Sequence, residues 1–310
     1  MSIPKTSTVI GAGSMGPGIA ALLARHGSQV RLNDISEEVL ARAEKTAAGA
    51  ASTLDELGIP TVPGGSITFE LDQGKALSGT ELVIEAIPEK IELKKALLAQ
   101  VEAAVGEDVV IATNTSGIPI SDMAKDMAHP ERLIGMHWSN PPHLIPMIEV
   151  IKGERTTDEV QEKLIEIVKA FGYEAVVEKE VPGFVENRVL YAIMRECLSL
   201  VEQGVVSQKD LDTCIKWGIG YKLAVIGPMR LLDMAGLDIY QAVASYLNQD
   251  LSNEAGVSSL VTDLTSQKKL GMKTGEGMYS YGEGEVDAKR ADIIRGLVAT
   301  RKVLSEIKPV

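Results

Sequence analysis

The sequence contains little cysteine, no long apolar run and no leader-like segment. Its 310 residues include two cysteines, Cys197 and Cys214, whose spacing fits no metal site. A disulfide framework is therefore not expected, and the thiols indicate a reduced, cytoplasmic protein. No stretch reaches the roughly 18 apolar residues that a membrane-spanning helix needs, so no membrane partner is expected. The short polar start, Met1 to Thr6, is unlike a signal peptide.

Basic residues are also too few for a nucleic-acid-binding protein. Lysine and arginine total 31 against 43 aspartates and glutamates, a formal net charge of −12, and no basic run offsets it. Because nucleic-acid backbones bind basic surfaces, no nucleic-acid partner is expected. What remains is an ordinary globular composition, 45% hydrophobic and 24% charged, in a chain long enough for two domains and a sizeable core.

A glycine-rich turn near the N-terminus is the most informative motif. The strand-like run Thr8 to Ile10 leads into GAGSMG at residues 11–16, and a small-residue helix follows over Ile19 to Ala24. In a βαβ dinucleotide-binding unit the three glycines allow a tight turn, a close approach of the backbone to a pyrophosphate, and close packing of the helix. The pyrophosphate lies on the helix N-terminus. The predicted cofactor contacts in this turn are Gly11, Gly13, Ser14, Met15 and Gly16.

An acidic residue follows the second strand of this unit. Asp34 comes after the strand-like segment Val30 to Leu32, where a carboxylate binds the adenine ribose hydroxyls and repels a 2′-phosphate. A solvated residue at a strand end is the alternative. NAD is therefore predicted over NADP, with the nearby Arg31 as the one residue that could neutralise a phosphate.

The rest of the chain divides into two parts of different character. Strand-like and helical patterns alternate over residues 1–182, which predicts an α/β domain of the Rossmann type with a mostly parallel sheet between helices. One helix is expected to begin at a capping box, Thr156 to Glu159. After VPGF at 181–184 the pattern is helical, so residues 183–310 are predicted to form an all-helical C-terminal domain.

His137 and Glu149 are the candidate catalytic pair. His137 follows a strand that begins at Leu133, and open α/β sheets place ligand-binding groups at such strand ends. Glu149 interrupts an apolar run, and a carboxylate buried in a strand needs a charged or hydrogen-bonding partner. A histidine whose ring N–H is held by a carboxylate is a better general base, so the pair predicts acid–base catalysis. A structural histidine is the alternative.

Other polar side chains are expected near the same edge of the sheet. Asn114, Thr115 and Ser116 close the strand that begins at Val109, although a polar turn or a helix N-cap would use the same residues. Asn187 is a polar residue of the first C-terminal helix that faces back towards the domain boundary, with a solvated helix face as the alternative.

With these residues in view, the chain resembles the 3-hydroxyacyl-CoA dehydrogenase family over essentially its whole length, including KTGEGMYSY at 273–281. The resemblance implies that His137 is the catalytic base and Glu149 its partner. It implies that Ser116 and Asn187 contact the substrate. The nicotinamide side of the cofactor would be contacted by Glu89, Lys94 and Asn114.

The chain also departs from the acyl-CoA members of this family. It has HWSNPPHLIP at 137–146 where those enzymes usually have HFFNP, and a longer loop at 220–228. Those enzymes grip the CoA nucleotide with a lysine-bearing helical hairpin. The corresponding stretch here, 41–75, is short and mostly acidic, and is broken by prolines and glycines. These departures favour a compact substrate with one or two charges. The resemblance of HWSNPPH, VPGFVENRVLYA (181–192) and WGIGYK (217–222) to one branch of the family implies a carboxylated aldehyde or alcohol, above all a pyridine aldehyde. Lys222 is the candidate partner for its ring carboxylate, with a solvated loop lysine as the alternative.

Three functions are left open. An NAD-dependent dehydrogenase for a small carboxylated aldehyde or alcohol is favoured, and no metal is predicted. A 3-hydroxyacyl-CoA or L-gulonate-type hydroxy-acid dehydrogenase comes second. A dinucleotide-binding structural protein without turnover comes third, because the chain retains His137 and Glu149. The long apolar faces of the C-terminal helices, such as Val189, Ile193 and Leu200, predict a homodimer through residues 183–310.

Overall fold

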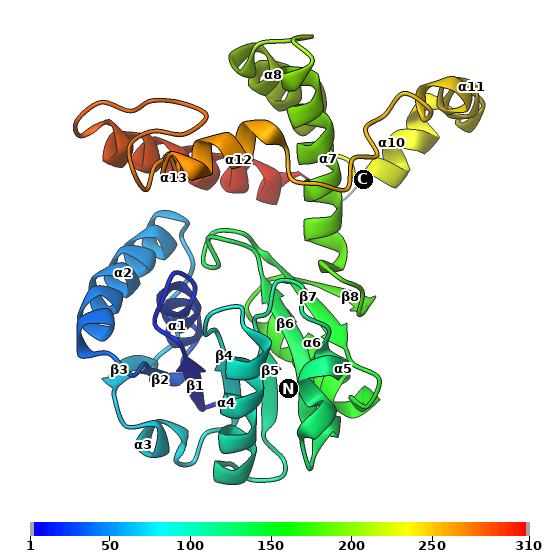
Figure 1. The fold of residues 1–310 in the computed structure, drawn as a ribbon. Coiled ribbons are helices and arrows are strands. Elements are labelled where there is room, and N and C mark those ends of the chain that lie inside the picture. Colours follow the sequence, from blue (N-terminus) through cyan, green and yellow to red (C-terminus); the bar gives the residue numbers. More distant parts are fainter. Residues whose placement is uncertain (1–2, 308–310) are drawn as a thin grey trace. The chain divides into compact units, whose positions relative to one another are not determined.

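The computed structural model describes residues 3–307, which form two compact units (Figure 1). The first unit runs to Arg188 and the second begins at Val189. The two compact units thus divide inside helix α7 (Phe184–Glu202), and the domain boundary at residue 182 stays a prediction. The units divide inside α7 because its first turn belongs to the first unit, where Phe184 is fully buried in the apolar core.

An eight-stranded sheet forms the centre of the first unit, with the strand order β3-β2-β1-β4-β5-β6-β7-β8. Its strands are β1 (Thr6–Ile10), β2 (Gln29–Asn33), β3 (Ser66–Glu70), β4 (Leu82–Glu85), β5 (Val110–Thr113), β6 (Leu133–Trp138), β7 (Met147–Lys152) and β8 (Glu174–Lys179). All neighbouring strands pair in parallel except β6 and β7, which pair antiparallel. The predicted mostly parallel Rossmann-type sheet is confirmed. The strand order reverses between β1 and β4, and ligands bind at such a switch point.

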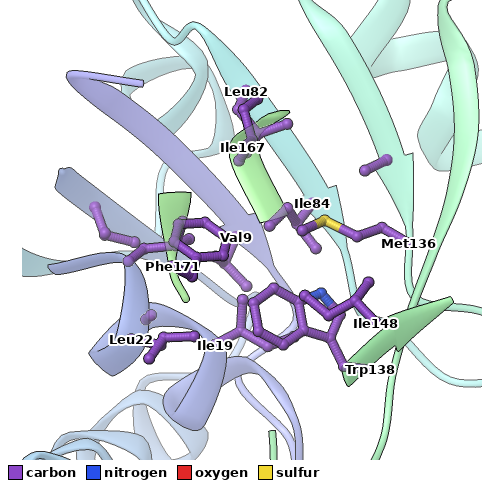
Figure 2. Packing of buried hydrophobic residues seen from close by; sticks show 14 of the residues in the cluster. Val9, Ile19, Leu22, Leu82, Ile84, Met136, Trp138, Ile148, Ile167 and Phe171 are labelled. Atoms are coloured by element: carbon purple, nitrogen blue, oxygen red, sulfur yellow. The ribbon is translucent and has the colours of Figure 1, made fainter. Parts of the chain in front are cut away.

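Helices cover both faces of this sheet. They are α1 (Gly16–Arg25), α2 (Glu37–Glu56), α3 (Gln73–Leu77), α4 (Ile91–Ala104), α5 (Ile120–Met123) and α6 (Asp158–Ala170), with 3-10 turns at Ala124–Asp126 and Pro130–Arg132. One face packs on α1, α2 and α6 around Val9, Met136 and Trp138 (Figure 2). The other packs on α4 and α5 around Val83 and Ile111. Successive strand residues alternate between the two cores, as a two-sided sheet requires.

Helix α6 begins one residue later than the predicted capping box. The Thr157 hydroxyl accepts the N–H of Val160 at 3.3 Å and is the N-cap. The Thr156 hydroxyl is buried and donates instead to the carbonyl of Leu133 at 2.6 Å. The prediction was therefore wrong by one position, because a contact with the sheet uses the first threonine of the pair.

Over residues 189–307 the regular elements of the second unit are helices, as predicted, and they are joined by irregular chain with two isolated β-bridges. After α7 come α8 (Gln208–Cys214), a π-helix (Ile215–Gly220), α9 (Tyr221–Leu223), α10 (Pro228–Ala235), α11 (Leu237–Leu247), α12 (Ser259–Ser266) and α13 (Glu285–Glu306). Lys222 thus lies in a helix and not in the predicted loop. Gly218 and Gly220 precede it, and glycine weakens a helix without removing its hydrogen bonds. Among residues 3–307, none of the helices combines the length and apolar character that crossing a membrane requires.

Candidate active site

A cleft of about 880 Å³ opens at the switch point of the sheet. It is lined by most of the predicted cofactor contacts, namely Gly11, Gly13, Ser14, Met15, Asp34, Glu89 and Asn114, and by Ser116. Ile35 and Leu93, which are 97% and 49% exposed, add apolar surface beside Asp34. A dinucleotide has two rings and a charged centre, and this mixture of apolar walls and polar groups suits one.

The three glycines of the turn have different surroundings, which tests whether NAD fits the cleft. A Cβ atom on Gly16 would lie 2.0 Å from the carbonyl oxygen of Gly11, and one on Gly11 would lie 2.5 Å from that of Ala86. These two glycines are required by the protein's own packing. Apart from its two chain neighbours, a Cβ atom on Gly13 would meet no atom of residues 3–307 within 4 Å, although Gly13 lines the cleft. The space beside Gly13 is therefore left for a ligand, as a pyrophosphate at the start of α1 requires.

The charges around Asp34 favour an unphosphorylated ribose. The Asp34 carboxylate accepts the N–H of Ala12 at 2.9 Å and the N–H of Ser36 at 3.1 Å, which holds it at the cleft. The Arg31 guanidinium donates to the carbonyls of Ser78 and Ala76, at 2.5 and 3.2 Å. Because Arg31 is engaged at the end of α3, it is not available to neutralise a 2′-phosphate beside Asp34.

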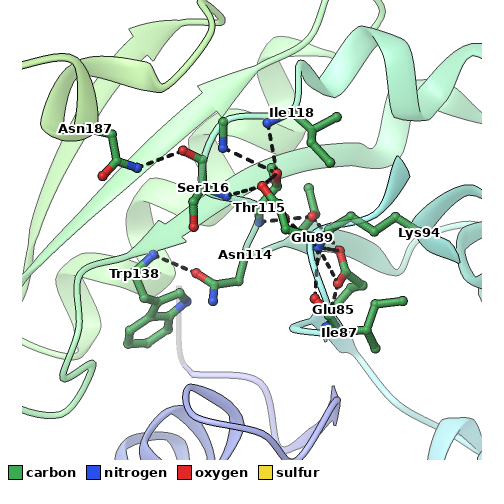
Figure 3. Close-up of polar contacts among 12 residues, drawn as sticks. Glu85, Ile87, Glu89, Lys94, Asn114, Thr115, Ser116, Ile118, Trp138 and Asn187 are labelled. Atoms are coloured by element: carbon green, nitrogen blue, oxygen red, sulfur yellow. Dashed lines mark hydrogen bonds and ion pairs between the residues drawn. The ribbon is translucent and has the colours of Figure 1, made fainter. Parts of the chain in front are cut away.

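Lys94 and Glu85 form a buried ion pair below the loop that follows β4 (Figure 3). The Lys94 ammonium donates to both carboxylate oxygens of Glu85, at 2.7 and 2.9 Å, and lies 3.3 Å from the carboxylate of Glu89. Both Lys94 and Glu85 are 0% exposed, and Lys94 does not line the cleft. We interpret Lys94 as holding Glu89 and this loop in place, whereas the resemblance predicts a direct cofactor contact. Glu85 was missed, although an acid at the end of an apolar strand signals such a site.

The loop after β5 brings Asn114, Ser116 and Asn187 together, and Figure 3 shows the contacts that do so. The Asn114 side-chain oxygen accepts the N–H of Trp138 at 2.9 Å, which ties this loop to the end of β6. The Asn187 amide donates to the carbonyl of Ser116 at 2.8 Å. Glu89 accepts the N–H of Ser116 at 2.8 Å. Residues predicted from three segments, namely Glu89, Asn114 with Ser116, and Asn187, thus belong to one connected site.

His137 and Glu149 lie directly opposite each other on the antiparallel strands β6 and β7. The Nδ1 atom of His137 is 2.6 Å from Oε2 of Glu149, and both side chains are buried. Oε1 of Glu149 accepts the N–H groups of Glu186 and Val185, at 2.7 and 3.1 Å. Burial alone would raise the pKa of Glu149, but the hydrogen bonds from His137 and from the two backbone groups lower it below its usual value. Glu149 therefore stays ionised and fixes the N–H of the imidazole at Nδ1.

Two further acids adjoin this pair, and neither was predicted. Burial and the charge of Glu149 raise the pKa of Glu178, on β8, to about 7. Glu186 stands in the first turn of α7 and accepts the hydroxyl of Ser139 at 2.6 Å. Their sequence contexts carry little signal, because one lies on a half-exposed strand and the other in a charged run.

Lys222 lies in α9, in the second unit, and the contact of Lys222 with a substrate carboxylate stays a prediction. The first unit by itself contains the cleft, His137 and Glu149.

Asn114 lines the dinucleotide cleft and accepts a hydrogen bond from β6, the strand that carries His137 with its Glu149 partner. An NAD-dependent dehydrogenase has this arrangement of cofactor cleft and general base. The comparison with known families is more specific. Residues 6–181 match the NAD binding domain of 3-hydroxyacyl-CoA dehydrogenase, and residues 183–281 match the C-terminal domain of the same enzyme. The chain belongs to the 3-hydroxyacyl-CoA dehydrogenase family.

Known relatives cover nearly the whole chain. It is 50% identical over 299 residues to 5-formyl-3-hydroxy-2-methylpyridine 4-carboxylate 5-dehydrogenase of Mesorhizobium japonicum, covering 96% of this chain and 97% of the relative. A crystal structure of a dehydrogenase of that name, described as an NAD+ dependent dismutase, superposes with a TM-score of 0.95 at 48% identity, covering 99% and 100% of the two chains. The mitochondrial hydroxyacyl-coenzyme A dehydrogenase of Rattus norvegicus is 34% identical, covering 89% and 91%.

Proposed function

We propose that the protein is an NAD-dependent dehydrogenase that oxidises 5-formyl-3-hydroxy-2-methylpyridine 4-carboxylate, through its hydrated aldehyde, to the dicarboxylate. The observation that carries this proposal is the buried His137–Glu149 pair, which Asn114 connects to the cofactor cleft. The identity of the substrate is supported by the Mesorhizobium relative at 50% identity. The alternative relatives that act on CoA thioesters are more distant.

The hydrate of an aldehyde presents the same H–C–OH unit as a secondary alcohol. His137, whose Nδ1 is held by Glu149, would take the hydroxyl proton at Nε2, and Glu149 would stabilise the resulting imidazolium. NAD, when bound, supplies the hydride acceptor. Ser116 and Asn187, joined by a 2.8 Å hydrogen bond, are proposed to hold the substrate oxygens. In the reverse direction the same imidazolium would protonate the alkoxide of a reduced aldehyde. The two directions together convert two aldehydes and one water into a carboxylic acid and an alcohol.

The free thiols do not support the other common route of aldehyde oxidation, which begins with attack by a cysteine thiolate. Burial, followed by the charges of Asp212 and Glu196, raises the pKa of the Cys197 thiol and keeps it protonated. Cys214 is exposed on the following helix. A route through the hydrate needs neither thiol.

The surface near the cleft also disfavours CoA. The stretch 57–65 between α2 and β3 is irregular chain, and no basic helical hairpin is present within it. Of the bases in 41–75, Arg42 is paired with Glu38 at 3.4 Å. The other two bases of the stretch, Lys45 and Lys75, are exposed, and the same stretch carries five acids, so it disfavours binding of the anionic nucleotide part of CoA.

A homodimer through the C-terminal unit and a cytoplasmic location complete the proposal. Within residues 189–307, Val298, at 6% exposure, is the one buried hydrophobic side chain, while Val189, Met194 and Tyr191 are 55%, 49% and 71% exposed. A second copy covering these helices would bury that surface. Light scattering at micromolar concentration should give twice the chain mass, and a monomer would contradict the dimer.

The proposed activity is tested with purified protein against three substrates. NADH formation is measured with the pyridine aldehyde and with L-gulonate, and NADH consumption with acetoacetyl-CoA. The pyridine aldehyde should be turned over efficiently and the other two poorly. His137→Asn should lower kcat by about two to four orders of magnitude and leave NAD affinity nearly unchanged. The matched control is His129→Asn, because His129 is an exposed histidine that also contacts a glutamate. Efficient turnover of acetoacetyl-CoA alone would overturn the proposal.

A further inference from the structure

Glu186 presents a carboxylate oxygen that the chemistry described so far does not use. One oxygen of this side chain accepts the hydroxyl of Ser139 at 2.6 Å. The other, Oε2, is buried and has no hydrogen-bond partner within residues 3–307. Leaving a charged acceptor buried without a donor is unfavourable, and such atoms are concentrated where a ligand supplies the missing partner.

This carboxylate stands beside the catalytic pair. Single ligating atoms of His137, Glu149 and Glu186 all lie within 4.8 Å of one another. The three side chains do not suit a metal ion, because two of their ligand atoms are already used in hydrogen bonds. Nδ1 of His137 is hydrogen-bonded to Glu149, and Oε1 of Glu149 accepts two backbone N–H groups. Glu186 is thus the member of this group with an unused lone pair next to the base.

The proposed substrate has a donor of the required kind. A hydrated aldehyde carries two hydroxyl groups on the reacting carbon, whereas a secondary alcohol or an unhydrated aldehyde carries at most one oxygen there. If His137 takes the proton of one hydroxyl, the second hydroxyl lies within the same few ångströms and needs an acceptor. A hydrogen bond to a carboxylate also adds electron density to the carbon from which the hydride leaves.

We infer that Glu186, oriented by Ser139, accepts a hydrogen bond from the second hydroxyl of the hydrated aldehyde and so favours oxidation of the hydrate. The inference rests on the proposed function. The second oxygen stays on the carbon and becomes the hydroxyl oxygen of the carboxylic acid. The first becomes its carbonyl oxygen once its proton has gone to His137 and the hydride has left the carbon. Reduction of the free aldehyde involves no second hydroxyl and therefore gains nothing from Glu186.

The test compares the two directions of catalysis in Glu186→Gln. Initial rates are measured separately with the aldehyde and excess NAD, and with the aldehyde and excess NADH, and the acid and alcohol products are quantified. We expect kcat/KM for oxidation to fall about 10- to 100-fold, the effect of one hydrogen bond to a charged group, while reduction changes less than about threefold. Glu180→Gln is the matched control, because Glu180 also accepts a serine hydroxyl, that of Ser121, and does not belong to the group formed by His137, Glu149 and Glu186.

The outcomes separate this inference from the proposed function. If the unaltered enzyme does not oxidise the aldehyde, the proposed function fails. If it does, and Glu186→Gln either keeps full oxidation or loses both directions equally, the inference is wrong. Ser139→Ala keeps the carboxylate and removes the group that orients it, so it should lower oxidation selectively by a smaller factor. It provides the same comparison should Glu186→Gln fail to fold, and equal losses in both directions would again overturn the inference.

Discussion

Replacing Lys94 by methionine is the most informative test of how the floor of the cofactor site is built. The change keeps most of the unbranched side chain and removes the ammonium that bridges Glu85 and Glu89. Glu85, at 0% exposure, would keep two donors, the Thr113 hydroxyl at 2.6 Å and the N–H of Ile87 at 2.7 Å. It would lose both of its bonds to a cation.

The expected loss of stability follows from those contacts. Two charge-assisted bonds at about 1.5–3 kcal/mol each give about 3–6 kcal/mol. Removing one partner of a buried ion pair costs about 3–5 kcal/mol, which agrees with the sum of the two hydrogen bonds. We therefore expect Lys94→Met to lower the free energy of unfolding of the first unit by about 3–5 kcal/mol. The double variant Lys94→Met with Glu85→Gln should recover most of this loss, because no charge is then left without a partner.

The assay is urea unfolding followed by tryptophan fluorescence in a Trp217→Phe background. The sequence has two tryptophans, and Trp138 is 1% exposed in the first unit, so its emission reports that unit alone. Saturating NAD is added in a second series to measure cofactor binding. A loss below about 1 kcal/mol with greatly weakened NAD binding would refute the reasoning and would favour direct contact between Lys94 and the cofactor.

Three further predictions concern the cofactor cleft and the acid on β8. The unaltered enzyme should prefer NAD over NADP by at least about 100-fold in kcat/KM, and Asp34→Asn should reduce this preference by about tenfold or more. Equal kcat/KM with both cofactors in the unaltered enzyme would contradict the role of Asp34. Gly13→Ala should abolish NAD binding, measured by calorimetry, and leave the stability unchanged. Gly16→Ala should destabilise the first unit, because its Cβ would lie 2.0 Å from a carbonyl oxygen. Loss of stability in Gly13→Ala with normal NAD binding would show that the cleft is misassigned. Glu178 binds its proton more tightly in the folded protein, where its pKa is about 7, than when unfolded, so the enzyme loses stability as the pH rises from about 4.5 to about 7. Glu178→Gln should remove this loss, so its free energy of unfolding should rise by about 1–2 kcal/mol relative to the unaltered protein between pH 5 and pH 8, after allowance for screening by solvent. A difference in urea midpoint between the two proteins that does not change with pH would disprove the shift.

Local patterns in the sequence determined the class of fold and the kind of chemistry. The glycine turn, the following small-residue helix and Asp34 are separated by fewer than about 25 residues, so their spacing alone predicts a dinucleotide unit. Glu149 was found because a carboxylate is out of place in an apolar strand. Alternation of strands and helices predicted the parallel sheet, because a helix between two strands returns the chain to the end of the sheet where the first strand began.

Only the tertiary structure decided which distant side chains meet. His137 faces Glu149 because β6 and β7 pair antiparallel in one particular register, which strand patterns do not specify. Arg31 turns to the carbonyls of Ser78 and Ala76, and Lys94 turns to Glu85, because long flexible side chains take whichever buried partner the packing offers. The buried oxygen of Glu186 is likewise a product of where α7 begins relative to the sheet. The sequence thus determined which groups were available for catalysis, and strand register and packing determined which of them share a site.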